Sequence, residues 1–124
     1  ITIFSTGCVL PDVLNAAKNL LSMYGKSVRV INIHTLKPID KDIIIKAARE
    51  TDLLFTVEDH SIIGGLGTAV SEVLTDYYPK KLVRIGVNDE FPESGAPIDL
   101  YEKYGLSSKQ ILMKIKNELD IGNR

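Results

Sequence analysis

Four short apolar, β-branched runs alternate with longer segments of helical periodicity, and this alternation constrains the fold more than any other feature. The runs are residues 1–6, 27–33, 52–58 and 82–87. Each has the length and residue types of a strand and is followed by turn-forming residues. Parallel strands are joined through right-handed crossovers, which are usually helical. The alternation therefore predicts a three-layer α/β/α fold with helices on both faces of a parallel sheet.

The first predicted helix begins near Leu10 and ends at Gly25, a residue type that suits a left-handed helix end. Its apolar residues recur at the spacing of an α-helix, which indicates one inward face. The residues expected on that face are Val13, Leu14, Ala17, Leu20, Leu21 and Tyr24.

Capping residues mark the later helices. Asp40 is expected to cap the second helix, and Ser107 with Gln110 forms a capping box for the last. A short helix is expected over residues 97–104. The third helix has an expected inner face of Leu66, Ala69, Val70, Val73, Leu74 and Tyr77. Tyrosines near helix ends, Tyr77 among them, also suit a domain rim or a subunit contact.

Composition excludes several classes of protein. The 124 residues carry 15 Lys plus Arg against 16 Asp plus Glu, and the basic residues are scattered. This distribution argues against binding to nucleic acid or to an anionic membrane surface, and no apolar run approaches a membrane span of roughly 20 residues. The single cysteine, Cys8, cannot form an internal disulfide and is expected to be a small buried packing residue. We expect one cytoplasmic domain over residues 1–124.

Glu58, Asp59 and His60 follow the third predicted strand and are the strongest candidates for a functional site. Ligands of open parallel sheets bind at the carboxyl ends of strands. His60 could act as a general base oriented by either carboxylate. A structural or interface histidine is the favoured interpretation, because adjacent strand residues point to opposite faces.

Gly64, Gly65 and Gly67 open the third helix and have two interpretations. The free N–H groups of a helix N-terminus could bind a small anion. Alternatively, the glycines serve left-handed torsions and a close helix approach, which is the favoured interpretation. The spacing is not the dinucleotide fingerprint, which would follow the first strand.

Several segments together resemble the C-terminal domain of transketolases. They are VINIHTLKP at residues 30–38, TVEDH at 56–60, GGLGTAVS at 64–71, FPESGAP at 91–97 and LYEKYGL at 100–106. The likeness covers nearly the whole chain in order. It implies a four-stranded sheet in the order 2-1-3-4, mainly parallel, that lacks the family's antiparallel edge strand and leaves an unprotected edge there.

The resemblance also implies a function in a larger enzyme, a homodimer that transfers a two-carbon ketol unit between sugar phosphates in the pentose phosphate pathway. Thiamine diphosphate and Mg²⁺ would be bound by preceding domains or by a separate N-terminal subunit, so the isolated domain is expected to be inactive. Glu58, Asp59, His60, Gly64, Gly65 and Gly67 would face the dimer or domain interface.

Alternatives to this function remain open. The same domain type occurs in 1-deoxyxylulose-5-phosphate synthase and in the β subunits of 2-oxo-acid dehydrogenases. A regulatory module that binds a small anion at the turn over residues 64–67 is a further alternative, from a different class.

Overall fold

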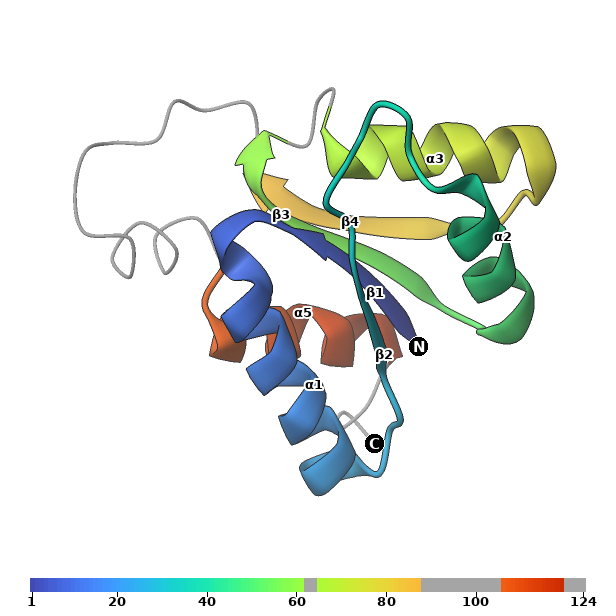
Figure 1. Ribbon diagram of the computed structural model, residues 1–124. Helices are drawn as coiled ribbons and strands as arrows, with labels where there is room; N and C mark the ends of the chain where they lie inside the picture. The colour runs from blue at the N-terminus through green and yellow to red at the C-terminus, as the bar shows by residue number, and fades with distance from the viewer. Residues whose placement is uncertain (62–64, 88–105, 120–124) are drawn as a thin grey trace.

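Four parallel strands form one sheet in the computed structural model, which describes residues 1–61, 65–87 and 106–119 (Figure 1). The strands lie in the order β2-β1-β3-β4. Each neighbouring pair is parallel. Their bounds are β1 Thr2–Thr6, β2 Arg29–Asn32, β3 Leu54–Ser61 and β4 Leu82–Val87. The predicted α/β class and strand order are therefore confirmed.

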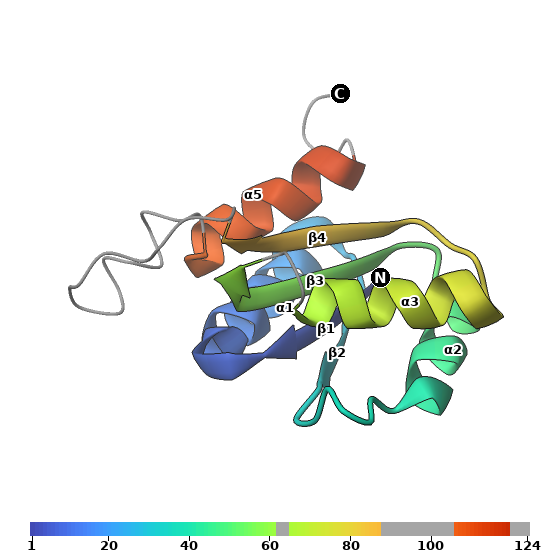
Figure 2. The same ribbon diagram turned by 90° about the horizontal axis from the view of Figure 1, so that it is seen from above.

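Helices cover both faces of the sheet, as crossovers between parallel strands require (Figure 2). A short 3₁₀ turn, η1 (Gly7–Val9), leads from β1 into α1. Helices α1 and α5 lie on one face, and α2 and α3 lie on the other. Their bounds are α1 Leu10–Tyr24, α2 Lys41–Glu50, α3 Leu66–Tyr77 and α5 Ser108–Leu119.

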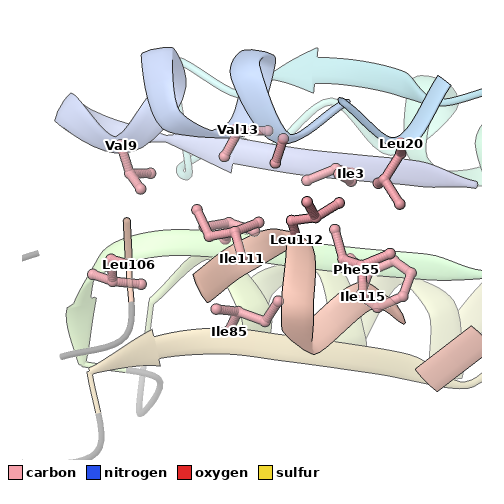
Figure 3. Close-up of a cluster of buried hydrophobic side chains, with 12 residues drawn as sticks. Ile3, Val9, Val13, Leu20, Phe55, Ile85, Leu106, Ile111, Leu112 and Ile115 are labelled. Carbon is pink, nitrogen blue, oxygen red and sulfur yellow. The ribbon is translucent and has the colours of Figure 1, made fainter. Parts of the chain in front are cut away.

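Two apolar clusters, one on each face of the sheet, form the core. Ile3 and Phe4 are neighbours in β1, yet they belong to different clusters because successive strand residues point to opposite faces. Figure 3 shows the first cluster, in which Val13 of α1 and Ile111 of α5 meet the sheet. The carboxyl ends of the strands are thereby held between two packed layers.

The predicted helix caps are confirmed. The Asp40 carboxylate accepts a 3.2 Å hydrogen bond from the backbone N–H of Ile43. Gly25 adopts a φ of 66° and ends α1. At α5 the Ser107 N–H donates to Gln110 Oε1 at 3.3 Å, and the Gln110 N–H donates to Ser107 Oγ at 3.4 Å. Short-range sequence signals therefore locate these helix ends correctly.

The predicted inner faces of α1 and α3 are too wide. Leu14 is 50% exposed, Leu21 is 58% exposed and Tyr77 is 54% exposed. The buried residues of α1 are Val13, Ala16 and Leu20. A helix packed on a flat sheet buries a narrow stripe, so apolar residues on its flank stay exposed unless a neighbouring element covers them.

Other boundaries differ in detail. The third strand begins at Leu54 and continues to Ser61, so it starts later and ends later than the predicted residues 52–58. The helix expected over residues 97–104 lies outside the described residues. Among the helices that the structure describes, none has the length and apolarity needed to cross a membrane.

Candidate functional site at the carboxyl end of the sheet

The acidic pair predicted as a site lies within β3, near its carboxyl end. Glu58 and Asp59 are consecutive strand residues, and their side chains therefore leave the sheet on opposite faces. Glu58 contacts α3, and Asp59 contacts the turn that follows β1. The backbone of His60 belongs to β3, but its side chain and the whole of Gly64 lie outside the described part of the chain.

Glu58 is fully buried and caps helix α3 from a neighbouring strand. Its Oε1 accepts a 3.0 Å hydrogen bond from the backbone N–H of Leu66, and its Oε2 accepts a 2.8 Å bond from that of Gly67. These N–H groups belong to the first turn of α3, which has no partner for them within the helix. The negative charge is also favourable at the positive end of the helix dipole.

This cap bears directly on the anion-binding hypothesis. Two of the N–H groups at the N-terminus of α3, those of Leu66 and Gly67, already donate to Glu58 and are not available to an anion. A second negative charge would also lie beside a buried carboxylate, which is electrostatically unfavourable. The geometry therefore argues against a small-anion site at this turn.

Asp59, like Glu58, accepts a hydrogen bond from a backbone N–H, but on the opposite face of the sheet. Its Oδ2 accepts a 3.1 Å hydrogen bond from the backbone N–H of Cys8 in η1. Gly7 has a φ of +80°, and a Cβ added there would lie 2.2 Å from Asp59 Oδ1. The turn after β1 thus requires glycine both for its backbone conformation and for the approach of this carboxylate.

The expectation that Cys8 is buried is wrong. The thiol residue is exposed, because η1 turns the chain away from the sheet before α1 begins, and Val9 rather than Cys8 enters the core. The backbone N–H of Cys8 donates to Asp59.

Gly67 allows a close approach between α3 and the sheet. A Cβ at this position would lie 2.6 Å from Cδ of Arg84 and 3.1 Å from Oγ1 of Thr56. The steric interpretation of this glycine is therefore supported. Gly65 has a φ of −97°, so the expected left-handed torsion does not occur there.

The hydrogen bonds of Glu58 and Asp59 limit the chemistry available at the carboxyl end of the sheet. Both carboxylate oxygens of Glu58 already accept backbone N–H groups, so that side chain is not free to orient His60. Within residues 1–61, 65–87 and 106–119, no three His, Cys, Asp or Glu side chains are grouped so that they could hold a metal ion. The described donor set does not fit Mg²⁺ together with a diphosphate group.

Sequence reasoning found the acidic residues but not their partners. Glu58 lies eight and nine residues before its two donors, a spacing that matches no local capping motif. Asp59 and Cys8 are 51 residues apart and meet only because β1 and β3 are neighbours in the sheet. A signal for Glu58 did exist: it is an acidic residue in a buried strand, a few residues before a helix whose N-cap residue, Gly65, has no side chain to serve as a cap.

The family model described as "Transketolase, C-terminal domain" matches residues 1–111. The chain belongs to this transketolase C-terminal domain family. The buried Glu58 and the glycine-rich start of α3 lie within the matched region of this transketolase domain.

Relatives of this transketolase domain include sections and subunits of larger enzymes. The chain is 44% identical over 120 residues to a putative transketolase C-terminal section from Methanocaldococcus jannaschii, covering 96% of this chain and 37% of the relative. It is 40% identical to the 6-deoxy-6-sulfo-D-fructose transketolase subunit SqwH of a Clostridium species, covering 90% and 34%. It is 37% identical to a 1-deoxy-D-xylulose-5-phosphate synthase from Caldanaerobacter subterraneus, covering 90% and 18%.

A solved structure agrees with the fold. The chain superposes with a TM-score of 0.86 and 42% identity on "Split gene transketolase, inactive beta4 tetramer", covering 97% of this chain and 39% of that one. The transketolase domain described above thus spans between about a fifth and two-fifths of the length of these relatives.

Proposed function

We propose that residues 1–124 form the C-terminal domain of an enzyme that transfers a two-carbon ketol unit between sugar phosphates. In this proposal the domain supplies a scaffold and contacts to other domains, and the reacting groups lie elsewhere. The observation that carries it is the internal use of the strand-end carboxylates. Glu58 holds the N-terminus of α3, and Asp59 holds the turn after β1. Neither arrangement presents a reactive carboxylate to a substrate.

Thiamine diphosphate and Mg²⁺ belong, in this proposal, to preceding domains or to a separate N-terminal subunit. Thiamine diphosphate supplies the nucleophilic carbon that carries a ketol unit. Holding it requires donors for the diphosphate and oxygen ligands for the metal. The N–H groups of Leu66 and Gly67 in the first turn of α3 are occupied by Glu58, and the described side chains contain no group of three possible metal ligands. The chain would act in the cytoplasm of the cell, as part of a homodimeric enzyme.

The outer edge of β2 is the proposed contact with the rest of the enzyme. Among the described strands β2 pairs only with β1, so its other edge has no strand beside it. Helix α1 lies next to this edge and exposes Leu14 and Leu21, which are two turns apart on one side. The opposite side of α1 contacts α5 through Asn15 and Ser108. An added strand could therefore pair with β2 and bury the exposed leucines.

His60 and the glycine turn remain the proposed points of subunit or domain contact. Glu58 and Asp59 would act there indirectly, since their bonds fix the chain on either side of the turn. We expect His60→Ala to weaken association of the complete enzyme more than it destabilises the fold. An unchanged association constant in sedimentation experiments would contradict this role.

Transketolase is favoured over the related synthase by the relatives. Identity is 44% to the transketolase section and 37% to the 1-deoxy-D-xylulose-5-phosphate synthase. The regulatory-module alternative is not favoured, because Glu58 already accepts two N–H groups at the start of α3 and puts a negative charge there.

Reconstitution tests the proposal. The chain is mixed with the thiamine-binding section of the same enzyme, thiamine diphosphate and Mg²⁺, and ketol transfer from a ketose phosphate to an aldose phosphate is measured. Activity is expected only when both sections are present. Turnover by the chain alone, or an unchanged rate when the chain is omitted, would contradict the proposal. Formation of 1-deoxy-D-xylulose 5-phosphate instead would identify the synthase alternative.

A further inference from the structure

Strand β4 forms the second edge of the sheet (Figure 2). It pairs with β3 alone among the described strands, so alternate N–H and C=O groups along its outer side have no strand partner there. A cavity of about 350 Å³ lies beside this edge. It is lined by residues 83–86 of β4 and by Lys114, Asn117 and Glu118 of α5. The outer edge of β4 therefore adjoins a concave surface.

Two cationic side chains at this edge come from opposite faces of the sheet. Ile85 packs in the cluster on the α1 and α5 face, so its neighbour Arg84 leaves β4 on the α3 face. The stem of Arg84 lies against Gly67 of α3, which agrees with this direction. Lys114 belongs to α5, on the other face. A strand placed beside β4 would thus have one cation near each of its own faces.

The side chains at this edge carry a net positive charge. Arg84 is exposed and makes no ion pair within the part of the chain that the structure describes. Glu118, the acidic residue of the cavity, lies 3.5 Å from Lys81, which offsets its charge. Packing of α5 partly buries Lys114, and this burial lowers the pKa of its ammonium group. A carboxylate bound beside Lys114 would favour its charged form.

We propose that the outer edge of β4 binds an extended acidic segment of a partner polypeptide. The segment would add a strand to the sheet, and its backbone would pair with the outward N–H and C=O groups of β4. Successive strand residues point to opposite faces, so two adjacent acidic residues would meet Arg84 on one face and Lys114 on the other. These two contacts would select acidic segments, because a basic segment would meet like charge.

Fluorescence anisotropy with a labelled peptide tests this site. The probe is the octapeptide TVTEEVTV, in which the two adjacent glutamates lie on opposite faces of an extended strand. We expect saturable binding to the wild-type chain with a dissociation constant below about 1 mM. The variant Arg84→Gln/Lys114→Gln removes both cations and should weaken binding by at least roughly fivefold. Thermal unfolding would check that the variant folds.

N-methylated peptides test the pairing of the backbone. Methyl groups on alternate nitrogens of TVTEEVTV remove the N–H groups from one edge of the extended peptide and leave those of the other edge. Of the two possible methylated peptides, one should lose binding and the other should keep it, because only one edge of the added strand would face β4. If both bind as well as the unmodified peptide, strand addition is wrong.

A matched control is Lys18→Gln/Lys46→Gln, which neutralises two exposed lysines that do not line this cavity. It should leave the dissociation constant unchanged. The proposal is overturned if the probe does not saturate up to about 1 mM, the result expected if the cations only protect an edge strand from association. It is also overturned if TVTKKVTV binds equally well, or if Arg84→Gln/Lys114→Gln binds like the wild type. None of these results bears on ketol transfer by the reconstituted enzyme, so the two proposals fail separately.

Discussion

Glu58 and Asp59 are adjacent acidic residues of β3 that make the same kind of hydrogen bond on opposite faces of the sheet. Each accepts a backbone N–H from the first turn of a helical segment, α3 for Glu58 and η1 for Asp59. Each carboxylate also contacts a glycine. The N–H of Gly67 donates to Glu58, and Gly7 lies against the side chain of Asp59. The two carboxylates differ in burial, since Glu58 is fully buried and Asp59 is partly exposed.

This difference decides how much each residue contributes to stability. Water can replace a lost partner at a partly exposed site but not at a fully buried one. Removal of Glu58 would leave two buried donors without an acceptor, whereas removal of Asp59 would leave the N–H of an exposed residue. Two similar carboxylates in the sequence are therefore expected to have very different mutational costs.

The largest effect is expected for Glu58→Ala. The variant loses two charge-assisted hydrogen bonds and leaves the N–H groups of Leu66 and Gly67 unpaired. We expect the free energy of unfolding to fall by about 3–5 kcal/mol, measured by urea denaturation. Glu58→Gln keeps one carbonyl acceptor and should lose less. A loss under about 1 kcal/mol for Glu58→Ala would show that the cap is not important.

Gly7→Ala tests the contact between Asp59 and the turn after β1, on the opposite face of the sheet from Glu58. Its Cβ would lie 2.2 Å from Asp59 Oδ1, and its φ of +80° disfavours alanine. We expect a loss of about 2–3 kcal/mol from the torsion together with the displaced carboxylate.

Two further variants separate the torsional cost at Gly7 from the cost of displacing the Asp59 carboxylate. In an Asp59→Ala background the same glycine change should cost only the torsional part, about 1–2 kcal/mol. Gly25→Ala is the matched control, because it has a φ of +66° and no atom within 4 Å of the added Cβ. Equal costs for the two glycines in the wild-type background would contradict the proposed clash.

Gly67→Ala is expected to cost about 1–2 kcal/mol in the same denaturation experiment. The added Cβ would lie 2.6 Å from Cδ of Arg84, whose exposed side chain can move, and 3.1 Å from Thr56 Oγ1, which is buried. Arg84→Ala should recover part of the loss. If the double variant is no more stable than Gly67→Ala, the clash with Arg84 is not the cause.

Asp59→Asn should have the smallest effect, about 0.5–1 kcal/mol, because the amide oxygen can still accept the N–H of Cys8. The measurement is the midpoint of urea unfolding at a constant m-value. If this variant cost as much as Glu58→Ala, burial would not be what distinguishes the two carboxylates.

Local sequence patterns were sufficient to predict the elements and layers of the fold, but not the order of the strands. Alternating strand and helix patterns predicted the layers, and the family resemblance supplied the strand order. Asp40 and the Ser107–Gln110 box were found because a capping residue and its N–H partner are at most three residues apart.

The partners at the site could not be predicted from spacing alone. Asp59 meets Cys8 only through the register of β1 and β3, and Glu58 meets α3 only after the chain has turned. The exposure of Leu14 also depends on which elements flank α1, and helical periodicity carries no information about neighbours. Such contacts belong to the tertiary structure.

Amide hydrogen exchange at Leu66 and Gly67 tests most directly whether Glu58 holds the start of α3. Exchange of Val70, in the middle of the helix, and of Cys8, on the opposite face, serves as the internal reference. In Glu58→Gln, which keeps one acceptor oxygen, at least one of the amides of Leu66 and Gly67 should exchange at least roughly tenfold faster than in the wild type relative to Val70, equivalent to about 1.4 kcal/mol, with Cys8 unaffected. Unchanged protection of both amides would contradict the assignment of Glu58 as the cap of α3.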